Sequence, residues 1–145
     1  MPTVTDVTSV HATGLNHIDS LLDAGPAWNY LQPGSNTLSY TFSVASGNED
    51  NRTDVTAFTA SQQANTRTQL AYITSITGIQ FSGTDSGSAA VLHFAMTDIV
   101  GASTSGLCSW GSSYGFDGNN QITSYSANAY VYLDSVEWGT QNLAL

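Results

Sequence analysis

The sequence predicts an α+β fold of the α/β-like kind, with one long helix and a short N-terminal helix accompanying a twisted, mixed sheet. Two observations predict it. Residues 59–78 have the pattern of a capped helix, whereas the other apolar segments have the length and alternation of strands. One strand precedes this helix and another follows it directly, and such a strand–helix–strand step brings its two strands into parallel pairing. We therefore expect the long helix to pack on the sheet.

The long helix has clear signals at both ends. Thr59 is a good N-cap, and Gln62 three residues later completes a capping box, with Phe58 placed to pack back as a hydrophobic staple. Gly78 suits the left-handed position that commonly ends a helix. The expected apolar face has roughly helical spacing and consists of Ala60, Ala64, Leu70, Ala71, Tyr72, Ile73 and Ile76.

The remaining elements are predicted in order from periodicity and turn residues. Residues 1–12 show no periodicity and are expected to form a flexible arm. Residues 13–23 form a short amphipathic helix, which Gly25 and Pro26 end. The alternating or apolar segments predict strands at 37–44, 79–81, 90–96 and 129–134. Residues 97–128 are rich in Gly, Ser and Asn and predict a long surface segment with one edge strand near 107–111.

Composition limits the classes of partner. The 145 residues suit one domain, with 41% hydrophobic and 9% charged residues. Two Lys and Arg residues against eleven Asp and Glu residues give a net charge of −9, so no basic face can form for nucleic acid or an anionic membrane. No apolar run approaches a membrane span, and the N-terminus lacks the basic start and apolar core of a signal peptide.

The titratable residues show no convincing catalytic or metal-binding pattern. His11, His17 and His93 lack the spacing of a helical metal site, so packed or solvated side chains are expected. The carboxylates of one loop, Glu49, Asp50 and Asp54, fit either a solvated charged loop or a general acid/base pair.

Cys108 is the single cysteine, so no internal disulfide forms. It is either a buried or half-buried inert thiol or, with a base nearby, a reactive one. No nucleophile elbow, phosphate loop or dinucleotide fingerprint occurs, although a hydrolase using a serine or Cys108 remains an alternative. No catalytic or metal-ligating residue is predicted for the chain.

Several segments occur together in an order and spacing that one enzyme family shares. They are 13–22 (TGLNHIDSLL), Trp28, 38–43 (LSYTFS), 58–63 (FTASQQ), 77–81 (TGIQF), 92–95 (LHFA) and 129–133 (AYVYL). Together they resemble the N-terminal subdomain of the serralysin-type zinc metallopeptidases, which are metzincins. The resemblance covers residues 13–145 and implies a mostly parallel sheet with an antiparallel edge strand and a backing helix.

The resemblance implies part of a secreted, bacterial-type zinc endopeptidase, which hydrolyses peptide bonds with metal-activated water when complete. The family's zinc motif, His-Glu-x-x-His-x-x-Gly-x-x-His on a second long helix, does not occur in these 145 residues. We expect that the chain ends before this helix, belongs to an enzyme only as part of a longer protein, and alone neither holds zinc nor cleaves. The missing C-terminal part of the same domain would be one partner.

One role can be carried over from the family. In metzincins the edge strand of the sheet binds the substrate peptide as an added antiparallel strand. The matching residues of this chain are Leu107, Cys108, Ser109, Trp110 and Gly111. An exposed edge offers unpaired backbone groups, so peptide addition is physically reasonable. The alternatives are a non-catalytic module that binds a peptide or partner protein at this edge, and an edge blunted by glycine and serine that binds nothing.

Overall fold

The computed structural model describes residues 3–8, 14, 37–45 and 52–139. The chain divides into two compact units, one of Met1–Ser35 with Ser112–Ala127 and a larger one of Asn36–Gly111 with Asn128–Leu145. Apart from Gly14, the helix predicted at 13–23 lies outside the described residues. None of the helices within them is long and apolar enough to cross a membrane.

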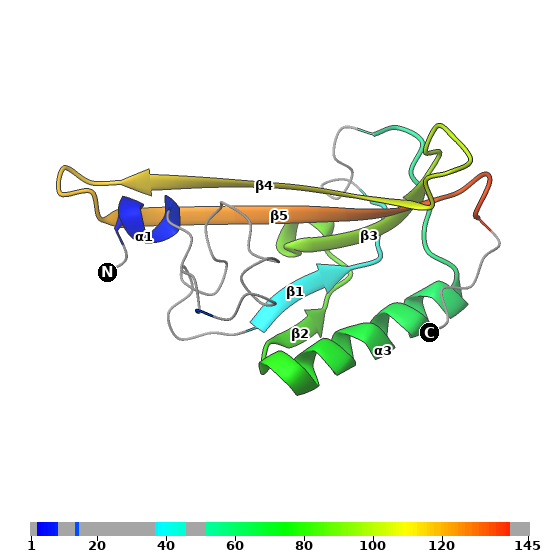
Figure 1. Cartoon of the computed structure of the whole chain (residues 1–145), viewed down its shortest axis with the longest axis horizontal. Helices are drawn as coiled ribbons and strands as arrows, with labels where there is room; N and C mark the ends of the chain where they lie inside the picture. Colours follow the sequence, from blue (N-terminus) through cyan, green and yellow to red (C-terminus); the bar gives the residue numbers. More distant parts are fainter. Residues whose placement is uncertain (1–2, 9–13, 15–36, 46–51, 140–145) are drawn as a thin grey trace. The chain divides into compact units, whose positions relative to one another are not determined.

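A five-stranded sheet has the strand order β2–β1–β3–β5–β4 (Figure 1). The strands are β1 (Thr37–Thr41), β2 (Gln80–Gly83), β3 (Leu92–Thr97), β4 (Gly106–Phe116) and β5 (Ile122–Asp134). Parallel pairing joins β1 to β2, β1 to β3 and β3 to β5. A tight turn joins β4 to β5, so these two strands run antiparallel. The predicted mixed, mostly parallel sheet with an antiparallel edge strand is confirmed.

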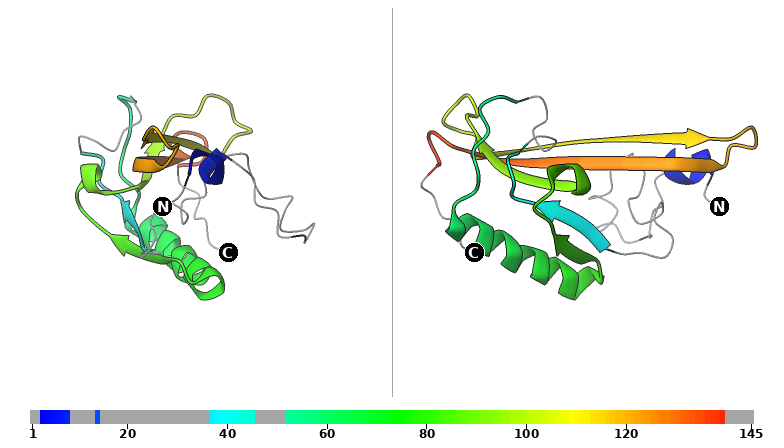
Figure 2. Two further views of the ribbon diagram at one scale, coloured as in Figure 1. Left: turned by 90° about the vertical axis from the view of Figure 1, so that its left-hand side faces the viewer. Right: turned by 180° about the vertical axis from the view of Figure 1, so that it is seen from behind.

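Helix α3 (Ala60–Thr77) begins and ends where the sequence predicts. The Thr59 hydroxyl accepts the Gln62 N–H at 3.3 Å and Gln62 Oε1 accepts the Thr59 N–H at 2.8 Å, which is a complete capping box. Gly78 has a φ of 75° and closes the helix. Figures 1 and 2 show this helix lying along the part of the sheet that contains β1 and β2.

The buried face of α3 differs from the predicted one. Leu70 and Gln62 are buried, whereas Tyr72 is 62% and Ile76 64% exposed. Each residue turns the helix by about 100°, so Tyr72 lies about 200° around the helix from Leu70 and cannot share its face. The polar Gln62 is buried because its side chain forms the capping bonds, which satisfy its polar oxygen.

The hydrophobic core lies between α3 and one face of the sheet. Its buried members are Phe58, Leu70, Phe94 and Met96. The Phe94 ring centroid lies 5.6 Å from that of Phe42 and 6.1 Å from that of Phe58. Side chains alternate along a strand, so His93 lies on the opposite face of β3 from Phe94. His93 is packed rather than solvated, and its ring stacks on that of Tyr130 at 4.6 Å.

Two segments contain more regular structure than predicted: residues 1–12, where a flexible arm was expected, and residues 97–128, where one short edge strand was expected. Helix α1 (Val4–Thr8) lies within residues 1–12, where the sequence predicts no element. The Thr3 backbone N–H and hydroxyl both donate to the Asp6 carboxylate, at 2.7 and 2.9 Å, so Thr3 and Asp6 provide the start signal. Gly, Ser and Asn are common in segment 97–128, yet most of it forms β4 and β5.

Side-chain hydrogen bonds explain two further features that were not predicted, the turn between β4 and β5 and the early end of β1. Asp117 Oδ1 accepts the backbone N–H groups of Asn119 and Gln121, both at 2.9 Å, and shapes the turn between β4 and β5. Asn120 has a φ of 60°, which this turn requires. Strand β1 ends at Thr41, before the predicted end, because the Ser43 N–H turns back to the Thr41 hydroxyl at 3.1 Å.

Candidate functional site

The five residues predicted to bind substrate lie together on β4, within the larger unit. β4 is the last strand of the sheet order, and in the described part of the chain β5 is its strand neighbour. Leu107 is 40% and Trp110 48% exposed, and Cys108 is exposed as well. The structure therefore places an accessible edge strand at the predicted position, although the strand extends farther than predicted, to Phe116.

The direction of the backbone groups follows from one hydrogen bond to β5. The Ser105 carbonyl, directly before β4, accepts the Asp134 N–H at 3.0 Å and so faces β5. The N–H and C=O of successive residues in an antiparallel strand point alternately to its two sides. Leu107, Ser109 and Gly111 therefore direct these groups toward β5. Cys108 and Trp110 direct theirs to the open side, about 7 Å apart along the strand.

The side chains of this edge divide between the two faces of the sheet. Cys108 and Trp110 share one face, while Leu107 and Ser109 share the other, because strand side chains alternate. The prediction of a buried or half-buried thiol at Cys108 is wrong, since the thiol is exposed at the sheet edge. An added peptide strand would therefore meet an indole on one face and a leucine side chain on the other.

Asp134 is the last residue of β5 and lies beside the start of β4. It is fully buried, and its carboxylate accepts the Ile99 N–H at 3.0 Å and the Trp138 N–H at 2.8 Å. These backbone donors, the Ile99 N–H foremost, hold the pKa of the Asp134 carboxyl below its ordinary value. Asp134 thereby ties the segments that follow β3 and β5 to the end of the sheet.

Three carboxylates gather at this end of the sheet. Asp98, Asp134 and Glu137 each place an oxygen within 4.8 Å of the others. The group contains no histidine or cysteine, which are common ligands of zinc. Both oxygens of Asp134 already accept backbone hydrogen bonds, so this residue has a structural role. The cluster makes this end of the edge strand electronegative.

Asp54 also has a structural role. Its carboxylate accepts the Thr97 hydroxyl at 2.9 Å and the Asp98 N–H at 3.2 Å. The bond from Thr97 is the largest cause that lowers the pKa of the Asp54 carboxyl. Arg52 donates to the same hydroxyl at 3.3 Å, and its guanidinium lies 4.9 Å from the centre of the Tyr132 ring. The two carboxylates predicted to lie in the same loop as Asp54, Glu49 and Asp50, are outside the described residues.

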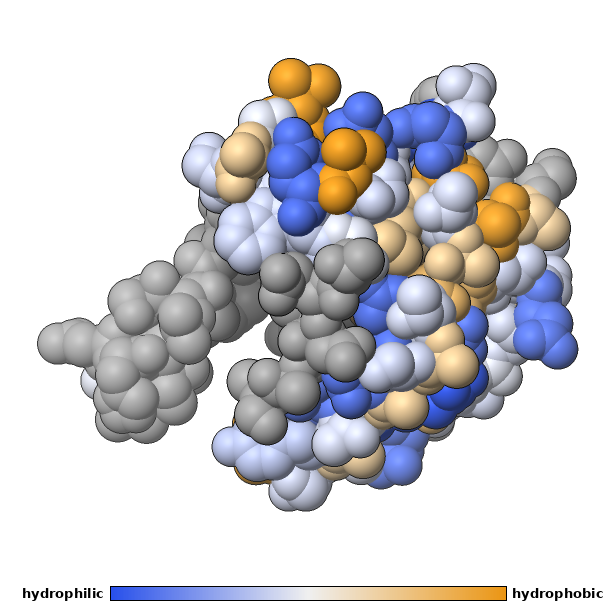
Figure 3. Space-filling view, turned by 90° about the vertical axis from the view of Figure 1, so that its right-hand side faces the viewer, coloured by the Kyte–Doolittle hydropathy of each residue, from blue (hydrophilic) through white to orange (hydrophobic). Residues whose placement is uncertain are grey.

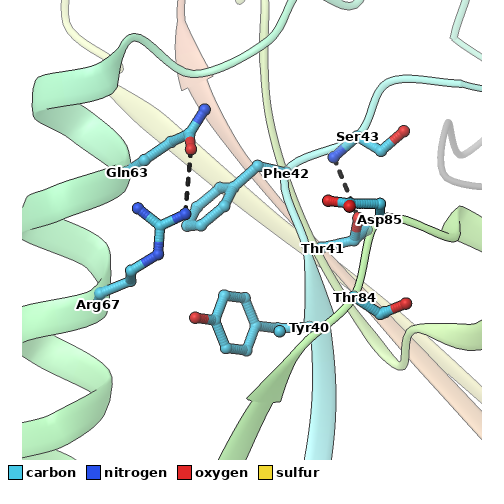
Figure 4. A pocket seen from close by; sticks show the side chains of 9 residues that line it. Tyr40, Thr41, Phe42, Ser43, Gln63, Arg67, Thr84 and Asp85 are labelled. Carbon is cyan, nitrogen blue, oxygen red and sulfur yellow. Dashed lines mark hydrogen bonds between the residues drawn. The ribbon is translucent and has the colours of Figure 1, made fainter.

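A second feature, which sequence reasoning missed, is a pocket of about 400 Å³ in the larger unit (Figure 4). It lies where β1 and β2 end, beside α3. Its lining residues are Tyr40, Thr41, Phe42, Ser43, Gln63, Arg67, Gly83, Thr84 and Asp85. They come from three separate segments without a shared motif, so no sequence pattern indicates the pocket.

Comparison of the chain with protein-family models, with curated proteins and with solved structures finds no match in any of the three. Function must therefore be inferred from the chemistry of the edge strand and the pocket. Figure 3 shows one face of the molecule, on which the apolar residues among the coloured ones lie in small groups between polar residues. The edge strand instead offers directed backbone hydrogen-bonding groups, which give affinity for an extended peptide.

Proposed function

We propose that the chain binds an extended peptide along the open side of β4, as the substrate-binding part of a secreted zinc endopeptidase of the kind it resembles. The complete enzyme would hydrolyse the peptide with metal-activated water. The residues of this chain bind and do not cleave, because the His-Glu-x-x-His motif does not occur among them. The observation that carries the proposal is the exposed edge strand with outward backbone groups at Cys108 and Trp110.

Strand addition would form the same kind of antiparallel backbone hydrogen bonds that join β4 to β5. An incoming antiparallel peptide would donate to and accept from the backbone of Cys108, and again at Trp110 two residues later. Each such hydrogen bond contributes about 1 kcal/mol net, since both partners give up bonds to water. The exposed Leu107 and Trp110 side chains add apolar contact on the two faces and give some preference for the peptide sequence.

Charge selects among peptides that could occupy this edge. The chain carries a net charge of −9, and the carboxylates of Asp98 and Glu137 lie beside Asp134 at the end of the sheet where β4 begins. Long-range electrostatics therefore favour basic peptides and oppose acidic ones. The steering weakens as salt screens the exposed carboxylates.

A non-catalytic binding module is the second candidate, and the exposed edge of β4 supports it equally. The same edge would then hold a peptide or partner protein without any later cleavage. The native reading frame distinguishes the two candidates. A frame that continues beyond Leu145 into His-Glu-x-x-His identifies part of a peptidase, whereas a stop directly after Leu145 identifies a module.

Cys108→Pro is expected to weaken peptide binding by about tenfold or more relative to Cys108→Ala. Proline removes the outward N–H and places its ring on the open side, whereas the bonds to β5 come from neighbouring residues. A tenfold change corresponds to about 1.4 kcal/mol, close to one lost hydrogen bond with some steric hindrance. The measurement is fluorescence anisotropy with labelled basic peptides of about six residues, the usual length of a strand.

Cys108→Ala is the matched control because it removes the thiol and keeps the backbone donor. The circular dichroism spectrum and denaturation midpoint of both variants establish that each is folded. Equal affinity of the two variants for the same peptides would remove strand addition at this edge as the binding mode.

The isolated chain is expected to show no zinc-dependent proteolysis. It lacks the histidines and the glutamate that would hold the metal and activate its water. The measurement is a casein-cleavage assay with added zinc, with and without a chelator, together with a zinc titration. Tight stoichiometric zinc binding or chelator-sensitive cleavage by the pure chain would overturn this expectation.

A further inference from the structure

The pocket beside α3 lies in a position suited to ligand binding. Its walls are formed by the ends of the parallel strands β1 and β2 and by the first half of α3. Crevices outside the carboxyl ends of parallel strands are common ligand sites in sheets of this kind. A volume of about 400 Å³ suits a small molecule.

Arg67 is held in a defined position at this pocket. Its Nη2 donates to Gln63 Oε1 at 3.2 Å, and its guanidinium lies 4.9 Å from the centre of the Phe42 ring. Gln63 is itself anchored, because its Nε2 donates to the Phe58 carbonyl at 3.1 Å. The amide oxygen therefore points to Arg67, and the ring supports the guanidinium from one side (Figure 4).

The charge of Arg67 is not neutralised by these contacts. The amide oxygen is a neutral acceptor and the ring an aromatic one, and these are its contacts among the described residues. A guanidinium carries five N–H donors in a planar fork, so most of them are available for a ligand. Such a fork matches the two oxygens of a carboxylate. Arg67 is also one of only two Lys or Arg residues in the chain.

The opposite side of the pocket carries a negative charge, which complements the positive charge of Arg67. Asp85 follows β2 and places a carboxylate across the strand ends from α3 (Figure 4). Tyr40 forms part of the wall, with its ring packed so closely on Gly83 that a Cβ there would lie 3.3 Å from the ring.

We infer that the pocket binds a small zwitterion, an amino acid or a dipeptide, with its carboxylate on Arg67 and its ammonium group on Asp85. The opposite charges on the two sides favour a ligand that carries both signs over a simple anion. The rings of Tyr40 and Phe42 favour an apolar or aromatic side chain. This site is separate from the β4 edge and does not depend on the function proposed for it.

The test uses L-phenylalanine, glycyl-phenylalanine, phenylalanine amide and N-acetyl-phenylalanine as probes. Binding is followed by nuclear magnetic resonance titration of the whole chain. A dissociation constant on the order of 1 mM is expected for the first two, and at least about tenfold weaker binding for the amide and the acetyl derivative. Tighter binding of glycyl-phenylalanine would identify dipeptides rather than free amino acids as the ligand.

Arg67→Lys keeps the positive charge and loses the planar fork, so binding of L-phenylalanine should weaken at least about tenfold. Asp85→Asn should weaken it similarly and should remove the preference for phenylalanine over N-acetyl-phenylalanine. Thr68→Ala is the matched control, because Thr68 is an exposed neighbour on α3 that does not line the pocket. Cys108→Pro should also leave this binding unchanged.

Failure of both zwitterionic probes to shift the resonances of the pocket residues in a saturable way would overturn the inference. Equal binding of the amide or of the acetyl derivative would overturn it as well. Because the assay reads pocket resonances, loss of peptide binding at β4 leaves its outcome unaffected.

Discussion

Replacing Phe94 by alanine is expected to lower the free energy of unfolding by about 3–5 kcal/mol, the range typical of a phenylalanine removed from a core. Phe94 is 9% exposed and lies at the centre of the core, with its ring near those of Phe42, Phe58 and Tyr40. Removing the ring forfeits its burial and leaves a cavity that the rigid sheet cannot fill. Urea denaturation followed by circular dichroism measures the change.

Phe116→Ala is the matched control for this loss. Phe116 is 57% exposed, so the same chemical change there should alter the free energy of unfolding by less than about 1 kcal/mol. Phe94→Leu should retain most of the stability, because leucine fills much of the space. Similar losses for Phe94→Ala and Phe116→Ala would show that the core is not centred on the Phe94 ring.

Asp134→Asn is expected to lower the denaturation midpoint at neutral pH and to flatten its decline in acid. The pKa of the folded Asp134 carboxyl lies below its ordinary value because the Ile99 and Trp138 N–H groups bond its ionised form. A group of this kind stabilises the fold fully above its unfolded-state pKa. That stabilisation is lost as the pH falls through its folded-state pKa, so the wild type should lose stability below about pH 4.

The measurement is a series of urea midpoints between neutral and acidic pH for the wild type and the variant. An asparagine can accept through one oxygen only, and its NH₂ group faces a backbone donor. Asp98→Asn removes a charge from the same cluster without removing an acceptor of these bonds, so its midpoint should remain near that of the wild type. A wild-type pH dependence retained by Asp134→Asn would assign the acid sensitivity to other carboxyls.

Local signals allowed the long helix to be predicted closely, since the Thr59 capping box and Gly78 act within a few residues. The buried face of that helix was harder to predict. Its apolar residues surround much of the helix, and the packing of the sheet determines that Leu70 is buried and Tyr72 exposed. The helix Val4–Thr8 is too short for periodicity to reveal.

The edge strand could be located from the sequence, but its direction of bonding could not. The hydrogen bond from the Asp134 N–H to the Ser105 carbonyl shows which backbone groups face outward, and these residues are far apart in the sequence. The pocket depends on tertiary structure as well, because Arg67 on α3 and Asp85 after β2 meet only when the two parallel strands pair. Single-residue propensities contain no information about such tertiary pairing.

Amide hydrogen exchange during peptide binding tests strand addition at β4 most directly. We predict that a bound peptide slows exchange of the Cys108 and Trp110 amides, which point to the open side. The Leu107 and Ser109 amides, which face β5, should be slow already and should change little. Slowed exchange at neither Cys108 nor Trp110 under saturating peptide would contradict strand addition.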